Sequence, residues 1–426
     1  MKLNHVLKRF LQFLCGFTLI AVIAGWIQKD IFHRSELYWY PFISAKFRFN
    51  DFTIFQEPFK LFHQRAFFES PDFVFAYPAP AAFVYQSFFS FGDYATAVFL
   101  TFCVLVVLSA CVLLGRAMHR RSLGVLQAVI FLGISLMLAY PFWYLLDRAN
   151  IEIVNWLLVA LGVTAYWEKK WYLAATMIGV AMSLKIFPFV FLALLISERK
   201  YLATAWGVFV GALSTVTSTW FIGPSYQIAS KGIAGGLAYF RLHYVLEIHN
   251  LEIGFDHSIF AIIKEALHAY LQKHLSATCI QEQYFPSWLN GYMLVAAILG
   301  LVVYFGKIRH LPRPNQILAL TIASILLPPV SYEYTLMYLY IPWAALVLFA
   351  ISSTDARKVP GLIFSFACLA FLLTPETYIS FRGLPIAGQL KALVLMTLFV
   401  VSVTCPFRSE EESGVAQGAG AVSAIQ

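Results

Sequence analysis

Long apolar runs alternate along the chain with short polar segments, and most runs are long enough to cross a membrane. A helix needs about 20 apolar residues to span the hydrocarbon core. The candidate runs are 10–28, 94–115, 122–142, 151–167, 171–197, 201–222, 288–306, 315–331, 335–352, 359–374 and 385–405. The pattern predicts an all-α integral membrane protein, a polytopic helical bundle with about 10–12 transmembrane segments.

The run 171–197 is too long for one crossing and contains Lys185 and Pro188 near its middle. Proline removes an amide donor and kinks or breaks a helix. Broken segments are tolerated in a membrane where they line a cavity. We therefore expect two short halves that meet at Lys185–Pro188 and form a hairpin that returns to the side from which it entered.

The distribution of lysine and arginine supports this hairpin, because cytoplasmic loops carry an excess of these residues. If the N-terminus is cytoplasmic, the short loops on the outer side contain only Arg148 and Arg382. The cytoplasmic segments contain Lys2, Lys8, Arg9, Arg116, Arg120, Arg121, Lys169, Lys170, Arg199, Lys200, Lys307, Arg309, Arg313, Arg357, Lys358 and Arg408. If 171–197 crossed the membrane only once, the basic residues Lys307, Arg309 and Arg313 would lie on the outer side, against the charge rule. We expect about twelve crossings, a multi-pass protein of the cell inner (plasma) membrane, and both termini in the cytoplasm.

Two large extracytoplasmic loops follow from this topology, at about 29–93 and 223–287. In the first loop, Phe67-Phe68 and Phe73–Phe75 predict short amphipathic helices that lie at the membrane surface. Residues 1–408 form one membrane domain. The tail 409–426 is rich in Glu, Gly and Ala, and we expect it to be disordered in the cytoplasm.

Composition narrows the function classes. Hydrophobic residues make up 60% of the 426 residues and charged residues 12%, against about 45–50% and about 25% in soluble domains. This excludes a cytosolic enzyme, a secreted domain and a disordered protein. The net charge of +8 comes from residues between apolar runs, so it reports topology and predicts no nucleic-acid partner.

Polar residues that could carry chemistry gather at the outer ends of the predicted spans. They are Asp51 and Tyr77 in the first loop; Asp147, Arg148, Asn150 and Glu152 from the third loop to the start of the fourth run; Lys185 at the hairpin; His257 in the second large loop; and Ser331, Glu333 and Tyr334 at the end of the eighth run and just after it. The topology brings all of them to one face, which predicts a site there.

Each of these residues also has a structural interpretation. Asp51 could be a solvated loop residue or could cap a helix, and the acids of 147–152 suit the positive end of a helix dipole. An unpaired Lys185 would be costly in the membrane, so it either forms a salt bridge with Glu152 or Asp147 or contacts an anionic ligand. His257 could be an ordinary surface residue.

The order of these segments resembles membrane glycosyltransferases of the GT-C fold, most closely family 87. That family was long catalogued as a domain of unknown function and includes polyprenyl-phosphate-mannose-dependent mannosyltransferases. The resemblance covers about 45–350. It rests on Asp51-Phe52, Tyr77-Pro78-Ala79-Pro80, the segment 147–152, Leu184-Lys185-Ile186-Phe187-Pro188, Asp256-His257-Ser258-Ile259 and Pro329-Val330-Ser331-Tyr332.

The resemblance implies a hexosyltransferase that moves a sugar, with mannose as the implied sugar, from a polyprenyl phosphate to a lipid or glycan acceptor on the outer face. It implies Asp51 as the general base and a lipid-linked donor without a further cofactor. Lys185, Arg148 and His257 are the candidate partners of the donor phosphate. Tyr332-Glu333-Tyr334 departs from the family pattern, which has a histidine here. No Asp-x-Asp pair is present, which favours a monophosphate donor without a metal.

A transporter or flippase of a lipid-linked or anionic solute is the alternative, since such proteins also use broken helices and intramembrane cations. They are usually built from internal repeats, and the sequence shows none. An O-antigen-type polymerase or ligase would be expected to rest on a late loop rich in arginine and histidine. The loop 223–287 has four histidines besides His257 (His243, His249, His268 and His274), but Arg241 is its one arginine. The membrane glycosyltransferase is therefore favoured.

Overall fold

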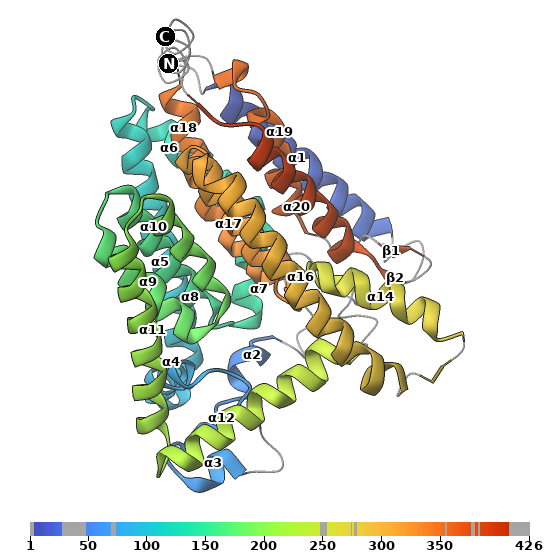
Figure 1. Ribbon diagram of the computed structural model, residues 1–426. Helices are drawn as coiled ribbons and strands as arrows, with labels where there is room; N and C mark the ends of the chain where they lie inside the picture. Colours follow the sequence, from blue (N-terminus) through green and yellow to red (C-terminus); the bar gives the residue numbers. More distant parts are fainter. Residues whose placement is uncertain are drawn as a thin grey trace, which may run out of the picture.

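The computed structural model describes residues 4–27, 48–69, 74–247, 254–273, 275–276, 279–353, 356–375, 380–381 and 384–408. Long helices pack lengthwise in a bundle, and α2, α3 and α12 lie at its lower end in Figure 1. The tail 409–426 and its expected disorder lie outside the described residues. This architecture is the all-α polytopic membrane protein that the sequence predicts.

The helices and strands have the following bounds. The first half contains α1 (His5–Trp26), α2 (Asn50–Thr53), η3 (Pro58–Leu61), α3 (Arg65–Glu69), α4 (Ala79–Phe89), η4 (Gly92–Tyr94), α5 (Ala95–Arg120), α6 (Val125–Leu138), α7 (Tyr140–Arg148), α8 (Glu152–Trp167), α9 (Trp171–Leu184), η5 (Phe187–Leu192), α10 (Ala193–Ser197) and α11 (Tyr201–Ile222). The second half contains α12 (Tyr226–Phe240), η6 (Arg241–Leu246), α14 (Ile259–Leu271), η7 (Ile280–Tyr284), α16 (Phe285–Gly306), η8 (Ile308–His310), α17 (Arg313–Leu326), η9 (Glu333–Leu339), α18 (Tyr340–Ser352), η10 (Ala356–Lys358), α19 (Leu362–Leu372), the antiparallel pair β1 (Ser380–Phe381) and β2 (Leu384–Pro385), and α20 (Ala387–Thr404).

Within the described residues, six helices are long and apolar enough to cross a membrane. They are His5–Trp26, Gly92–Arg120, Tyr201–Ile222, Glu282–His310, Glu333–Ser352 and Ala387–Thr404. The pair α6 and α7, bent by 56°, can form a seventh span. The helices α8, α9, η5–α10 and α19 are apolar but shorter. The crossing number and the cytoplasmic termini stay predictions.

The third apolar run differs from its expected end. Helix α6 stops at Leu138 because Pro141 has no amide hydrogen and disfavours a continuous helix. Ala139 is extended, and the amide of Tyr140 donates to the carbonyl of Leu373 at 2.7 Å. The chain then resumes as α7, which ends at Arg148 and not at 142. Asp147 and Arg148 therefore lie on a helix, and Glu152 begins the next one.

The run 171–197 forms the expected hairpin. Helix α9 ends at Leu184, Lys185 is extended, and η5 and α10 lead the chain back. The two ends of the hairpin, Trp171 and Glu198, both contact Tyr166 of α8. The rings of Tyr166 and Trp171 lie 5.9 Å apart, and the hydroxyl of Tyr166 donates to Glu198 at 3.3 Å. Lys185 is therefore carried to the opposite end of the bundle.

The two ends of the bundle differ in their chemistry. At one end, Asn4 before α1 donates to the carbonyl of Ala350 at 2.8 Å, and the amide of Phe407 after α20 donates to Asn315 at 2.7 Å. Arg313 pairs with Glu198 there at 2.8 Å. The start of α1 and the end of α20 therefore lie at the same end of the bundle as the basic loops. Arg148 and Lys185 lie at the other end.

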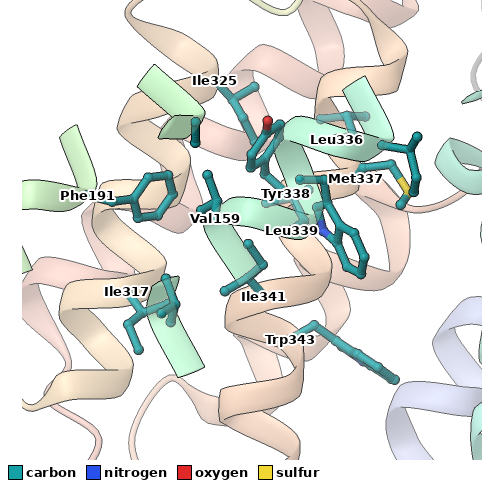
Figure 2. Packing of buried hydrophobic residues seen from close by; sticks show 14 of the residues in the cluster. Val159, Phe191, Ile317, Ile325, Leu336, Met337, Tyr338, Leu339, Ile341 and Trp343 are labelled. Carbon is teal, nitrogen blue, oxygen red and sulfur yellow. The ribbon is translucent and has the colours of Figure 1, made fainter. Parts of the chain in front are cut away.

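The core behind the candidate site comes from five elements. Figure 2 shows Val159 of α8, Phe191 of η5, Ile317 and Ile325 of α17, and Leu336–Leu339 of η9 packed together with Ile341 and Trp343 of α18. Val159, Phe191 and Ile317 have no exposed surface. Because its apolar side is enclosed in this way, η9 is a well-packed support for the polar residues at its start.

Candidate functional site

The backbone of Asp51 is anchored by aromatic packing and by hydrogen bonds. Phe49, with φ of 60°, begins the turn, and its amide donates to the carbonyl of Asp147 at 2.6 Å. Phe52 is fully buried and stacks on Phe99 with ring centroids 4.6 Å apart. The hydroxyl of Tyr85 donates to the carbonyl of Asp51 at 3.3 Å. The first loop therefore holds Asp51 against α4 and α7.

Several aromatic residues of this loop pack against one another. Phe67 and Phe75 are almost fully buried, and their rings lie 5.8 Å apart. Phe59 contacts both of them, at 5.0 and 5.6 Å. These rings form a core within the loop, and Phe67 and Phe68 lie on the short helix α3. The position of this helix at the membrane surface stays a prediction. Phe73 lies outside the described residues.

Both carboxylate oxygens of Asp51 accept hydrogen bonds from the end of α7. Arg148 donates to Oδ1 and forms an ion pair, and the side-chain amide of Asn150 donates to Oδ2 at 2.8 Å. Ala149 between them has φ of 50° and ends the helix in the left-handed conformation. The two donors come from residues 97 and 99 positions away from Asp51.

The orientation of Asn150 is set by a second hydrogen bond. Its Oδ1 accepts from the amide of Glu152 at 2.9 Å, so its NH₂ group must point toward Asp51. Asn150 is 1% exposed, whereas the side chain of Asp51 is 16% exposed. Asp147 turns away from this group and pairs with Arg48 at 3.4 Å.

Lys185 forms a salt bridge with Glu152, one of its two expected salt-bridge partners. The side chain of Glu152 is fully buried, and its Oε1 also accepts from the hydroxyl of Tyr338 at 2.6 Å. The ammonium of Lys185 lies 5.1 Å from the ring centre of Tyr334 and 5.8 Å from that of Tyr77. Its charge is therefore balanced by one carboxylate and two aromatic faces.

A small cavity lies beside Lys185, lined by Tyr77, Ala81, Ile151, Asn155 and Leu184. Tyr334 reaches from Lys185 to Tyr144 of α7, with ring centroids 6.5 Å apart. The segments expected to converge from the first loop, α7, the hairpin and η9 thus meet at one end of the bundle.

His257, Ser331 and Glu333 form a second buried group. His257 Nε2 lies 3.1 Å from Glu333 Oε2, and the amide of His257 donates to the carbonyl of Ser331 at 2.7 Å. Asp256 Oδ1 accepts from the amides of Ser258 and Ser331 at 2.8 and 2.9 Å. His257 has no exposed surface, so its interpretation as a surface residue is wrong.

The second buried group contains Lys391, which the sequence analysis did not single out. Its ammonium donates to Glu333 Oε1 at 2.8 Å and to the carbonyl of Thr374 at 2.9 Å, and Lys391 is 1% exposed. A lysine inside the apolar run 385–405 was the signal, because a charge at this depth requires a partner. The partner, Glu333, lies 58 residues away.

The fold and these two groups define a polytopic membrane protein with two networks of buried and partly buried charged side chains at the same end of its bundle. The family model of glycosyltransferase family 87 matches residues 75–330, more than half of the chain, so the chain belongs to glycosyltransferase family 87. No curated protein and no solved structure matches it. The protein is therefore a membrane glycosyltransferase. Asp51 and Lys391 lie outside the matched residues.

Proposed function

We propose that the protein transfers a hexose from a polyprenyl phosphate to a hydroxyl group of a lipid or glycan acceptor, at the extracytoplasmic face of the plasma membrane. Mannose is the sugar that the family resemblance favours. The observation that carries this proposal is the partly exposed carboxylate of Asp51, oriented by Asn150 and adjacent to the guanidinium of Arg148.

Asp51 serves as the general base in this proposal. The acceptor oxygen attacks the anomeric carbon and forms the new C–O bond, while its proton passes to Asp51. The bond between the anomeric carbon and the phosphate oxygen breaks, and its electron pair stays with the phosphate. Because the acceptor oxygen attacks from the side opposite the phosphate, this single displacement inverts the configuration and needs only one base. Because polyprenyl phosphate is a good leaving group, the step requires no general acid.

Arg148 and Lys185 supply positive charge for the phosphate. Arginine binds phosphate oxygens with two parallel hydrogen bonds, and lysine binds them as a point charge. Both side chains are partly exposed, at 22% and 20%. Tyr77 and Tyr334 flank Lys185 and offer aromatic faces and hydroxyl groups to the sugar.

The test uses purified protein in liposomes with radiolabelled polyprenyl-phosphate hexoses and a membrane lipid extract as the acceptor source. Wild type is compared with Asp51→Asn and with Asp93→Asn, which changes an exposed acid at the end of the same loop. Transfer by wild type and by Asp93→Asn, with loss in a folded Asp51→Asn, is the expected result. Movement of the lipid between leaflets without transfer from any donor would contradict the proposal and favour a flippase.

A further inference from the structure

Arg148 and Asp51 form an ion pair with each other. The proposed reaction, however, needs Asp51 to accept a proton and Arg148 to bind the donor phosphate. Arg148 donates to Asp51 Oδ1. A general base must have a lone pair that faces the acceptor hydroxyl. A phosphate ligand must be able to direct its N–H groups at the donor. A proton that arrived on Oδ1 would also break the charge-assisted hydrogen bond to Arg148.

Lys185 and Arg148 pair with carboxylates that differ in burial. Lys185 pairs with Glu152, whose side chain has no exposed surface and also accepts from Tyr338. Pulling Lys185 away would leave a buried carboxylate without its cation, which is costly. Asp51 keeps 16% of its side chain exposed, so it can lose Arg148 and still be solvated or bind an acceptor.

Asn150 stays on Asp51 when Arg148 leaves. The side-chain oxygen of Asn150 accepts from the backbone amide of Glu152, which fixes the orientation of its NH₂ group. That group donates to Oδ2 of Asp51, whereas the hydrogen bond from Arg148 goes to Oδ1. The carboxylate therefore keeps its orientation while Oδ1 becomes accessible.

We propose that Arg148 exchanges Asp51 for the donor phosphate when the donor binds, so that Asp51 is released to accept a proton only in the donor complex. This inference rests on the proposed function. The phosphate forms a bidentate contact with the guanidinium, and its charge grows as the sugar leaves, so the exchange favours the transition state. Arg148 is then a positioning residue for the base as well as a ligand of the donor.

The exchange predicts that Asp51 competes with the phosphate for Arg148. The test is a double-variant cycle on binding of farnesyl phosphate, a short polyprenyl phosphate, to the full-length protein in micelles. The variants are Asp51→Asn, Arg148→Gln and the double variant, with Asp93→Asn as the control for a general charge effect. Thermal unfolding verifies that each variant is folded.

The expected result is that Asp51→Asn binds farnesyl phosphate roughly threefold or more tightly than wild type, and that this gain disappears in the Arg148→Gln background. Arg148→Lys retains a charge without the bidentate geometry, so it should show a reduced gain; it also replaces Arg148→Gln if that variant does not fold. An equal gain in both backgrounds would show direct repulsion and overturn the exchange.

The outcomes separate the two proposals. If wild type transfers sugar but Asp51→Asn binds no more tightly than wild type, the exchange is wrong and the proposed function stands. If wild type neither binds farnesyl phosphate nor transfers sugar from any polyprenyl phosphate, both are wrong.

Discussion

Lys391 and Glu333 form an ion pair of 2.8 Å in which neither side chain is more than 2% exposed. The pair joins α20 to the start of η9, 58 residues earlier in the chain. The other oxygen of Glu333 faces His257 at 3.1 Å. Glu333 therefore ties the C-terminal helix and the second large loop to the element that also carries Tyr334 and Tyr338.

Removing the cation from this pair should destabilise the protein strongly. Lys391→Met leaves Glu333 as a buried carboxylate without its lysine, and such a loss costs about 3–5 kcal/mol. Thermal unfolding of the solubilised protein should show a clear decrease in the melting temperature. Lys273→Met, at an exposed position after α14, is the matched control. Combining Lys391→Met with Glu333→Gln should recover part of the loss, and equal melting temperatures for wild type and Lys391→Met would refute the assignment.

Asp256 should make stability depend on pH. Burial raises the pKa of Asp256 from its ordinary value of 3.8 to about 6. The folded state therefore binds this proton more tightly than the unfolded state. The resulting stability is fully present below about pH 4 and is lost as pH rises through about 6, by up to about 3 kcal/mol.

The measurement is the melting temperature of wild type and Asp256→Asn between pH 4 and pH 8. The asparagine retains an oxygen for the amides of Ser258 and Ser331 but cannot ionise. It should therefore gain stability relative to wild type as pH rises. Asp256→Ala removes that oxygen and should be less stable at every pH. A constant difference between wild type and Asp256→Asn would contradict the prediction.

Gly388 should not tolerate a side chain. A Cβ there would lie 2.6 Å from the carbonyl oxygen of Gly254 and 2.8 Å from backbone atoms of Asp256. Because these are backbone atoms, α20 or the loop must shift, which costs about 1–3 kcal/mol. Gly235→Ala is the control, since nothing lies within 4 Å of its Cβ and alanine favours the helix. Equal melting temperatures for the two alanine variants would show that Gly388 is not confined.

Asn150 should contribute to turnover through the orientation of Asp51. Asn150→Ala removes the donor to Oδ2, and a hydrogen bond to a charged group contributes about 1.5–3 kcal/mol. We expect kcat to fall roughly tenfold to a hundredfold, with the donor KM little changed. The measurement is steady-state kinetics of Asn150→Ala, with Asn290→Ala, which changes an exposed position on α16, as the control. A higher donor KM at constant kcat would show that Asn150 binds the donor and does not orient the base.

The helices could be predicted from the sequence because hydropathy is local. The run 201–222 has the bounds of α11, and 151–167 differs from α8 by one residue at its start. The break at Lys185 was signalled by Pro188 and by the charge itself. The end of α7 was not predicted for two reasons. Pro141 ends α6 but also stands in the first turn of α7, where proline is favoured. In addition, Tyr140–Arg148 is less apolar than the run before it.

The pairings within the site could not be predicted in the same way. The convergence of Asp51, Arg148 and Lys185 followed from topology, because span ends on one side must lie near one another. Which carboxylate each cation contacts depends on side-chain packing between distant segments. Lys185 had two possible acidic partners in the sequence, and Lys391 had no visible partner. Hydropathy contains no information on such long-range contacts.

The most direct test of the central claim is the single-turnover rate of sugar transfer by Asp51→Asn at saturating polyprenyl-phosphate hexose and acceptor. If Asp51 takes the acceptor proton, the rate should fall at least about a hundredfold, while the variant still binds farnesyl phosphate. A rate within tenfold of wild type would show that another group takes the proton and that Asp51 is not the base.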